Sequence, residues 1–297
     1  MRFVVYGAGA VGGVIGGRLH LAGVPVTLVA RGEHFVRLRE HGLVLDAPEG
    51  RHRIEAPVVS SVAQVHWSAE TVVLLTVKSH QTAAALDDLV RHAPPSTVVA
   101  CAQNGVANEP EVLRRFAATY AVCVMLPALH LDPGVVVQKC GPTPGILDLG
   151  RYPHGVDATA EAIAADLGLA GFESRPRPDI MAWKYRKLLT NAAGDVPTLF
   201  PRDEAPGLAD QVTAEGEAVL VAAGISAVTA AEDDERRGDL LQPRPDIAGF
   251  HGNSLAQSLA RGLPTEIHHR VGELVLLGRL HGVPTPACDR VLRECLK

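Results

Sequence analysis

A glycine-rich run, GAGAVGG, separates a short apolar strand pattern at residues 3–6 from a helical pattern that extends to about Leu21. Its first glycine permits a tight turn, its second lets backbone approach a pyrophosphate, and its third lets the helix pack closely on the strand. The start of the helix then offers N–H groups and a positive dipole end to phosphate. This context favours a Rossmann-type dinucleotide site over an ordinary tight turn. The predicted cofactor-binding residues here are Gly7, Ala8, Gly9, Ala10, Val11 and Gly12.

Strand-like and helix-like segments alternate through the first half of the chain. The near-continuous apolar run at 71–77 is typical of a strand buried on both faces, and a helix at 79–92 and another buried strand at 97–102 follow it. This order predicts an α/β fold, a Rossmann-type doubly wound and mostly parallel sheet with right-handed crossovers. Short strand-like pieces at 134–149 are expected to close the sheet with antiparallel strands, before a helix at 158–169.

The segment ESRPRP at 173–178 is the best candidate for a domain boundary, because strand signals nearly vanish after it. Helical periodicity takes over: Pro264 and Thr265 open a helix with apolar residues at three- and four-residue steps from Ile267 to Leu280. The sequence therefore predicts an NADP-binding Rossmann domain at 1–174. A C-terminal all-α domain, for substrate and dimerisation, is predicted at 175–297.

Composition argues against several classes of protein. With 297 residues, the chain carries a net charge of −5 and has no basic cluster, so electrostatics gives a nucleic-acid partner little support. No apolar run reaches the roughly 20 residues of a membrane span, and no secretory pattern is present, so we expect a cytoplasmic protein. The five scattered cysteines are expected to be reduced and mostly buried. None of the 13 histidines stands at ligand spacing with a carboxylate or cysteine, so no metal site is predicted.

The end of the second strand bears on the choice of cofactor. NAD sites usually place an acidic residue there, whereas this chain has Arg31, and a guanidinium suits a 2′-phosphate. Lys78 follows the next long buried strand and can add a second positive charge, although a solvated lysine at a strand end is an equal alternative. The sequence therefore predicts NADPH as cofactor.

Three further features are candidates for catalysis. Asn104 follows a buried strand, where open α/β sheets bind ligands, although Asn-Gly is also a common turn. Lys187 and Asn191 share one helix face, and a lysine held in a cleft can protonate a carbonyl oxygen during hydride transfer. Most helical lysines are simply solvated. The third feature is Ser254 with Glu266, whose carboxylate can equally be explained by the dipole of the helix expected there.

Taken together, the motifs resemble those of the ketopantoate reductase family. They are GAGAVGG, VARGEH, TVKSHQT, QNG, WKYRKLLTN and PTEI, in this order over nearly the whole chain. The resemblance implies a Rossmann domain joined to a helical domain, with the active site in the cleft between them and with a homodimer formed through the helical domain.

The resemblance also implies roles for single residues. Arg31 and Lys78 meet the 2′-phosphate of NADPH, and Asn104 lies near nicotinamide and substrate. Lys187 is the general acid, and Glu266 positions Lys187 or the substrate by a hydrogen bond. The residues that hold the substrate's polar groups are Asn191 and Ser254.

Two positions depart from the family pattern among the residues that read the substrate. Asp195 replaces a usual second asparagine one helical turn after Asn191, and His251 replaces an asparagine three residues before Ser254. We count both as substrate-binding candidates. An aspartate there repels an anionic acid unless it is protonated or paired, and His251 is the partner we consider.

Three functions follow from this. The first is NADPH-dependent reduction of 2-dehydropantoate (ketopantoate) to (R)-pantoate, as in pantothenate and coenzyme A biosynthesis. The second is reduction of another small 2-oxo acid or ketone, because of Asp195 and His251. The third is a non-catalytic NADP(H)-binding sensor. The joint presence of four residues argues against it: Lys187, Asn191, Ser254 and Glu266. A β-hydroxyacid dehydrogenase also uses a helical Lys-x-x-x-Asn, but the expected glycine-rich turn before the lysine is missing.

Overall fold

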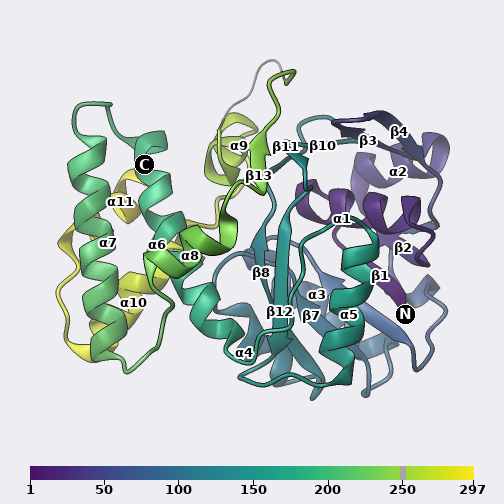
Figure 1. Ribbon diagram of the computed structural model, residues 1–297, viewed down its shortest axis with the longest axis horizontal. Helices are drawn as coiled ribbons and strands as arrows, with labels where there is room; N and C mark the ends of the chain where they lie inside the picture. The colour runs from purple at the N-terminus through teal and green to yellow at the C-terminus, as the bar shows by residue number, and fades with distance from the viewer. Residues whose placement is uncertain (248–251) are drawn as a thin grey trace. The chain divides into compact units, whose positions relative to one another are not determined.

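The computed structural model describes residues 1–247 and 252–297, which form two compact units (Figure 1). The first unit consists of residues 1–103, 108–180 and 237–248, and the second of residues 104–107, 181–236 and 249–297. The units are thus interleaved along the chain. The domain boundary at residue 174 stays a prediction. His251 lies outside the described residues.

A seven-stranded sheet in the order β12-β8-β7-β6-β1-β2-β5 forms the centre of the first unit. All its neighbouring strands are parallel except β12, which runs antiparallel to β8 along Ile146–Arg151. The predicted parallel sheet is confirmed, but of the strand-like pieces at 134–149 only β12 closes it, because residues 135–138 and 140–142 lie in two other sheets. Its strands are β1 (Arg2–Tyr6), β2 (Val26–Val29), β5 (Val58–Val59), β6 (Thr71–Leu75), β7 (Val98–Cys101), β8 (Thr119–Met125) and β12 (Ile146–Arg151).

The strand order reverses between β1 and β6, which are neighbours in the sheet. The chain proceeds from β1 to β2 on one side and from β6 through β7 to β8 on the other. In an open α/β sheet, ligands bind at such a switch point, beyond the carboxyl ends of the strands. The glycine run follows β1, and Thr76–Lys78 follows β6, so both stand at this point.

Helices cover both faces of this sheet. One face packs on α3 (Thr82–His92) and α4 (Asn108–Leu113), and the other on α1 (Ala10–Leu21) and α5 (Ala158–Leu169). Residues 79–81, predicted as part of α3, form a separate 3₁₀ turn. The remaining helix, α2 (Gly32–His41), follows β2.

A second sheet of four strands, in the order β4-β3-β10-β9, packs on α1. Close packing on this sheet and on the main sheet explains two glycines within α1. A methyl group added to Gly13 would lie 2.6 Å from Val136 Cγ1 of this sheet, and one added to Gly16 would lie 2.4 Å from Leu28 Cδ2 of the main sheet. The strands are β3 (Leu43–Ala47), β4 (Gly50–Ile54), β9 (Ala128–Leu129) and β10 (Val135–Gln138).

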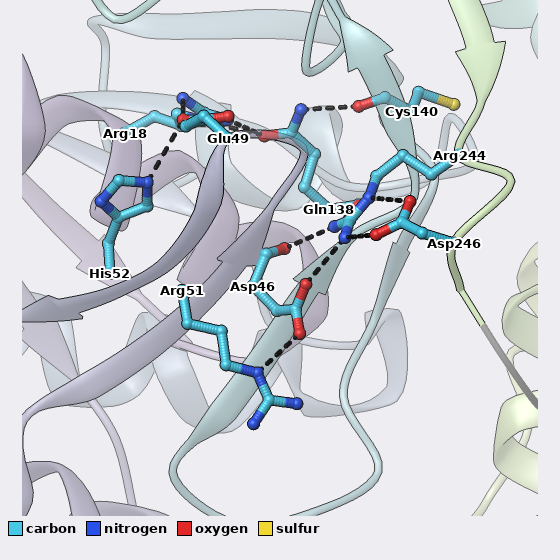
Figure 2. Close-up of polar contacts among 9 residues, drawn as sticks. All are labelled: Arg18, Asp46, Glu49, Arg51, His52, Gln138, Cys140, Arg244 and Asp246. Atoms are coloured by element: carbon cyan, nitrogen blue, oxygen red, sulfur yellow. Dashed lines mark hydrogen bonds and ion pairs between the residues drawn. The ribbon is translucent and has the colours of Figure 1, made fainter.

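The strand β13 (Leu241–Pro243) pairs antiparallel with β11 (Cys140–Pro142), although the sequence gives almost no strand signal after residue 178. Arg244, directly after β13, is anchored in the second sheet, as Figure 2 shows. Its Nη1 donates to the carbonyl oxygens of Asp46 at 3.1 Å and Gln138 at 2.9 Å, and its Nη2 lies 2.9 Å from Asp46 Oδ1. These contacts bring a distant part of the chain into the first unit.

We expect Arg244→Met to lower the free energy of unfolding by about 2 kcal/mol, because its hydrogen bonds are lost and Asp46 loses a partner. The Arg244 side chain is only 7% exposed. Arg51→Met is the control: Arg51 also pairs with Asp46, at 2.9 Å, but its side chain is 74% exposed. We expect it to cost less than about 0.5 kcal/mol. Urea unfolding measures both, and equal losses would contradict the anchoring role.

The second unit is helical in its described residues, as predicted. Apolar side chains from α6, α7, α10 and α11 form its core. One expectation is wrong: no continuous helix runs from Pro264, because residues 267–269 form a 3₁₀ turn and Arg270 leaves helical geometry at φ −120° and ψ −103°. The helices are α6 (Ile180–Leu199), α7 (Ala205–Ala222), α8 (Ala230–Arg237), α9 (Ser254–Ala260), α10 (Val271–His281) and α11 (Pro286–Cys295). None of the helices described in either unit combines the length and apolar character needed to cross a membrane.

Candidate active site

The glycine run forms a tight turn between β1 and α1. Gly7 has φ +111°, a value that disfavours any side chain, and its N–H donates to the Val29 carbonyl at 3.1 Å. A methyl group added to Gly12 would lie 2.3 Å from the Gly7 carbonyl oxygen and 2.4 Å from Thr76 Oγ1. A methyl group on Gly9 would meet nothing within 4 Å. Gly7 and Gly12 are therefore required by the protein's own packing, whereas Gly9 faces open space.

The first turn of α1 is suited to an anion. Gly9 is its N-cap and makes no side-chain capping bond, and the turn contains no acidic residue. The N–H groups of Ala10 and Val11 belong to this first turn, which has no intrahelical partner for them. Together with the open space at Gly9, this arrangement fits the pyrophosphate of a dinucleotide.

Arg31, at the start of α2, is held by two side chains of the main sheet and α3. Its Nη2 lies 2.6 Å from Tyr6 Oη and 3.4 Å from Asp88 Oδ2. The Tyr6 hydroxyl donates to Asp88 Oδ2 at 2.8 Å. Burial, and then this hydrogen bond, raise the pKa of the Tyr6 phenol, so the phenol keeps its proton. The Arg31 side chain remains 59% exposed and accessible to a ligand phosphate.

Sequence reasoning missed Tyr6 and Asp88. A tyrosine as the last residue of an apolar strand was the available signal, since a buried phenol needs a hydrogen-bond partner.

Lys78 stands in the loop after β6, which ends at Leu75 and not at Val77 as predicted. It is partly buried, and its backbone N–H donates to Gln81 Oε1 at 3.3 Å. The amide of Gln103 fixes the same loop by donating to the Val77 carbonyl at 2.8 Å. Lys78 thus follows β6 and Arg31 follows β2, the two strands that flank β1 in the sheet.

In the second unit, three predicted site residues form one hydrogen-bonded chain. Lys187 Nζ donates to Asn191 Oδ1 at 3.2 Å, one turn further along α6. Asn191 Nδ2 donates to Asn104 Oδ1 at 3.3 Å. The amide of Asn191 is therefore oriented from both ends, with its oxygen toward the lysine.

Backbone packing fixes Asn104 beside the segment that precedes α10. Gly105 has φ +81°, and a methyl group there would lie 2.6 Å from the His269 carbonyl oxygen. The N–H of His269 in turn donates to the Glu266 carbonyl at 2.9 Å. Glu266 itself is buried, with 7% exposure. It stands before a 3₁₀ turn, so the dipole of a long helix does not account for it.

Asp195 is fully buried and forms an ion pair with Arg270, at 2.7 Å between Oδ1 and Nη2. Asn253 Nδ2 also donates to Asp195 Oδ1, at 3.0 Å. Arg270 makes two further contacts: its Nη1 donates to Ser254 Oγ at 2.9 Å, and its Nη2 to the Asn191 carbonyl at 3.1 Å. The negative charge of Asp195 is thus balanced inside the protein by Arg270, a partner that sequence reasoning did not consider.

The sequence contains a signal that marks Arg270 as a buried arginine. It stands three residues after Ile267 and four before Leu274, on the apolar stripe that marks the core. An arginine on such a stripe requires an internal counter-ion, because burying an unpaired guanidinium is costly. Asp195, which stands where the family usually has an asparagine, was the carboxylate that needed a partner.

Models of the ketopantoate reductase PanE/ApbA family match residues 3–154, and models of its C-terminal part match residues 179–295. The chain belongs to the ketopantoate reductase PanE/ApbA family. It is therefore an oxidoreductase of this family, as the sequence motifs indicate.

Curated relatives and solved structures match over almost the whole length. The 2-dehydropantoate 2-reductase of Halobacterium salinarum is 30% identical over 96% of this chain and 95% of its own length. That of Pyrococcus horikoshii is 27% identical over 96% and 93%. A ketopantoate reductase structure from Ralstonia eutropha has a TM-score of 0.82 at 26% identity, covering 100% of this chain and 97% of its own.

A D-mandelate dehydrogenase solved with NADH and anilino(oxo)acetate has the same fold, with a TM-score of 0.85 at 24% identity. It covers 100% of this chain and 97% of its own. Proteins with this fold therefore act on more than one 2-oxo or 2-hydroxy acid.

Proposed function

We propose that this protein catalyses the NADPH-dependent reduction of 2-dehydropantoate to (R)-pantoate, the reaction by which its relatives are named. The observation that carries the proposal is the hydrogen-bonded chain Lys187–Asn191–Asn104, which places a lysine ammonium on an oriented amide. A solvated helical lysine, the simplest alternative, has no need of such a chain.

The first unit offers the groups that fit the cofactor. Backbone at Gly9 and the first turn of α1 suit the pyrophosphate, and Arg31 and Lys78 are the cations for the 2′-phosphate. When bound, NADPH supplies a hydride to the 2-oxo carbon of the substrate.

The second unit offers the acid and the substrate contacts. Lys187 Nζ donates a proton to the 2-oxo oxygen as negative charge develops there. Asn191 Oδ1 accepts from Nζ and so aims the remaining ammonium protons. Ser254 and Asn191 bind the polar groups of the substrate, and buried Glu266 positions Lys187 or the substrate.

The direct test measures NADPH oxidation with 2-dehydropantoate and with a panel of other 2-oxo acids, aromatic ones included. Turnover with 2-dehydropantoate at the highest kcat/KM supports the proposal. The second candidate is reduction of another 2-oxo acid, favoured by the Asp195–Arg270 pair among the substrate residues, and a higher kcat/KM with such an acid would establish it. If NADPH binds but no acid is reduced, the result favours the non-catalytic sensor. The homodimer implied by the resemblance is tested separately by light scattering.

We expect Arg31→Ala to raise the KM for NADPH roughly ten- to a hundredfold, because charge-assisted hydrogen bonds to the 2′-phosphate are lost. The KM for NADH, which lacks this phosphate, should change less than about twofold by the same argument. Arg37→Ala is the matched control, since Arg37 lies on α2 and pairs with Glu33 at 3.8 Å. A loss of NADH and NADPH affinity in equal measure would remove Arg31 from cofactor selection.

A further inference from the structure

Asp195 and Arg270 form a buried pair whose role rests on the proposed reduction of a 2-oxo acid. We propose that Arg270, held by Asp195, is a positioning residue that determines substrate affinity by fixing the Ser254 hydroxyl and the Asn191 backbone. Residue 195 then acts from inside the protein and makes no contact with the substrate. This assigns to Asp195 a different task from that of the asparagine usual in the family.

The burial of the pair supports this task. The Asp195 side chain is 0% exposed and that of Arg270 is 5% exposed. A carboxylate so enclosed cannot hydrogen-bond to a substrate hydroxyl, and its charge is balanced at 2.7 Å. The repulsion of an anionic acid that an open aspartate causes is thereby removed.

The guanidinium joins two segments that bear substrate residues. Nη1 reaches Ser254 Oγ at the start of α9, and Nη2 reaches both Asp195 and the carbonyl of Asn191 on α6. A guanidinium is a planar fork with fixed donor directions, so one side chain sets the distance between these two segments. Asn253 adds a second link, since its Nδ2 donates to Gly194 and Asp195.

The contact with Ser254 also defines what this hydroxyl can offer. A guanidinium only donates, so Ser254 Oγ accepts from Arg270 and retains its own O–H proton for another acceptor. The Asp195–Arg270 pair is neutral as a whole, so it places no net charge beside this hydroxyl. An oxygen acceptor of the substrate, such as the carboxylate of a 2-oxo acid, suits the O–H donor of Ser254.

The test uses four variants. Two are single substitutions, Arg270→Lys and Ser254→Ala. The third is a double variant, Asp195→Asn with Arg270→Met, and the fourth is a triple variant that adds Ser254→Ala to this double variant. Lysine keeps a charge for Asp195 but lacks the fork, and the double variant removes both buried charges together, so both can fold where a single charge deletion fails. For each variant, kcat and KM are measured with the best 2-oxo acid, together with the Kd of NADPH and the Tm.

We expect Arg270→Lys and the double variant to raise the KM of the acid about tenfold. A change of this size corresponds to the loss of one charge-assisted hydrogen bond. The Kd of NADPH should stay within about twofold, because the contacts of Arg270 in the second unit do not include the glycine loop. Ser254→Ala should raise KM similarly and add little to the double variant, since the two changes remove one coupled contact.

A wild-type KM in the double variant, at any Tm, would overturn the positioning role and leave the pair merely structural. Full additivity of Ser254→Ala with the double variant would do the same. If the wild-type protein reduces no 2-oxo acid at all, the proposed function itself fails, and the inference falls with it. These outcomes are distinct because wild-type turnover is measured first.

Discussion

Replacing Lys187 by alanine is expected to lower kcat with the best 2-oxo acid by at least about a hundredfold, the usual contribution of a general acid. The substitution removes the ammonium that Asn191 Oδ1 holds at 3.2 Å. Because the Lys187 side chain is only partly buried, the free energy of unfolding should change little. Steady-state kinetics measure the effect, with the Kd of NADPH as the check that the first unit is intact.

Thr190→Ala is the matched control for this variant. Thr190 is exposed on the same helix, and its hydroxyl donates to the carbonyl of Arg186 within the helix, at 3.2 Å. We expect its kcat to remain within about twofold of wild type, because it has no part in the proposed chemistry. A Lys187→Ala variant as active as Thr190→Ala would exclude Lys187 as the acid and leave the proposed mechanism without a proton donor.

The central sheet could be predicted because buried parallel strands have sequences that are continuous apolar runs. The run at residues 71–77 is one of these, and the glycine turn after Tyr6 is a second local signal. The strand β13 could not be predicted, since its three residues Leu241–Pro243 are a strand only through pairing with β11. The contacts of Arg244 with Asp46, almost two hundred positions apart, are likewise invisible to any local pattern.

The site residues also divide into those that local spacing predicts and those that only packing brings together. Spacing within one helix predicts that Lys187 and Asn191 share a face, and their hydrogen bond agrees with this. The link from Asn191 to Asn104 spans 87 positions and depends on packing. The same is true of Arg270: the sequence showed that Asp195 needs a partner, but only the folded chain selects Arg270 over other cations.

Substituting alanine for Gly12 is expected to destabilise the protein by about 3 kcal/mol, the upper range for overpacking a rigid site. The added methyl group would lie 2.3 Å from the Gly7 carbonyl oxygen and 2.4 Å from Thr76 Oγ1. The first of these atoms is backbone and cannot turn away, so the start of α1 must move. Thermal or urea unfolding measures the loss, and NADPH binding should fail with it because the phosphate-binding turn is displaced.

Gly9→Ala separates the cofactor's requirement for glycine from the protein's own. Its backbone, at φ −75° and ψ −152°, is open to alanine, and the methyl group would meet nothing within 4 Å. Stability should therefore stay within about 0.5 kcal/mol of wild type. The Kd of NADPH should nevertheless rise at least about tenfold, because the methyl group occupies the space through which backbone approaches the pyrophosphate. If Gly9→Ala binds NADPH as wild type does, the cofactor does not pass over this turn, and the Rossmann-type binding mode is wrong.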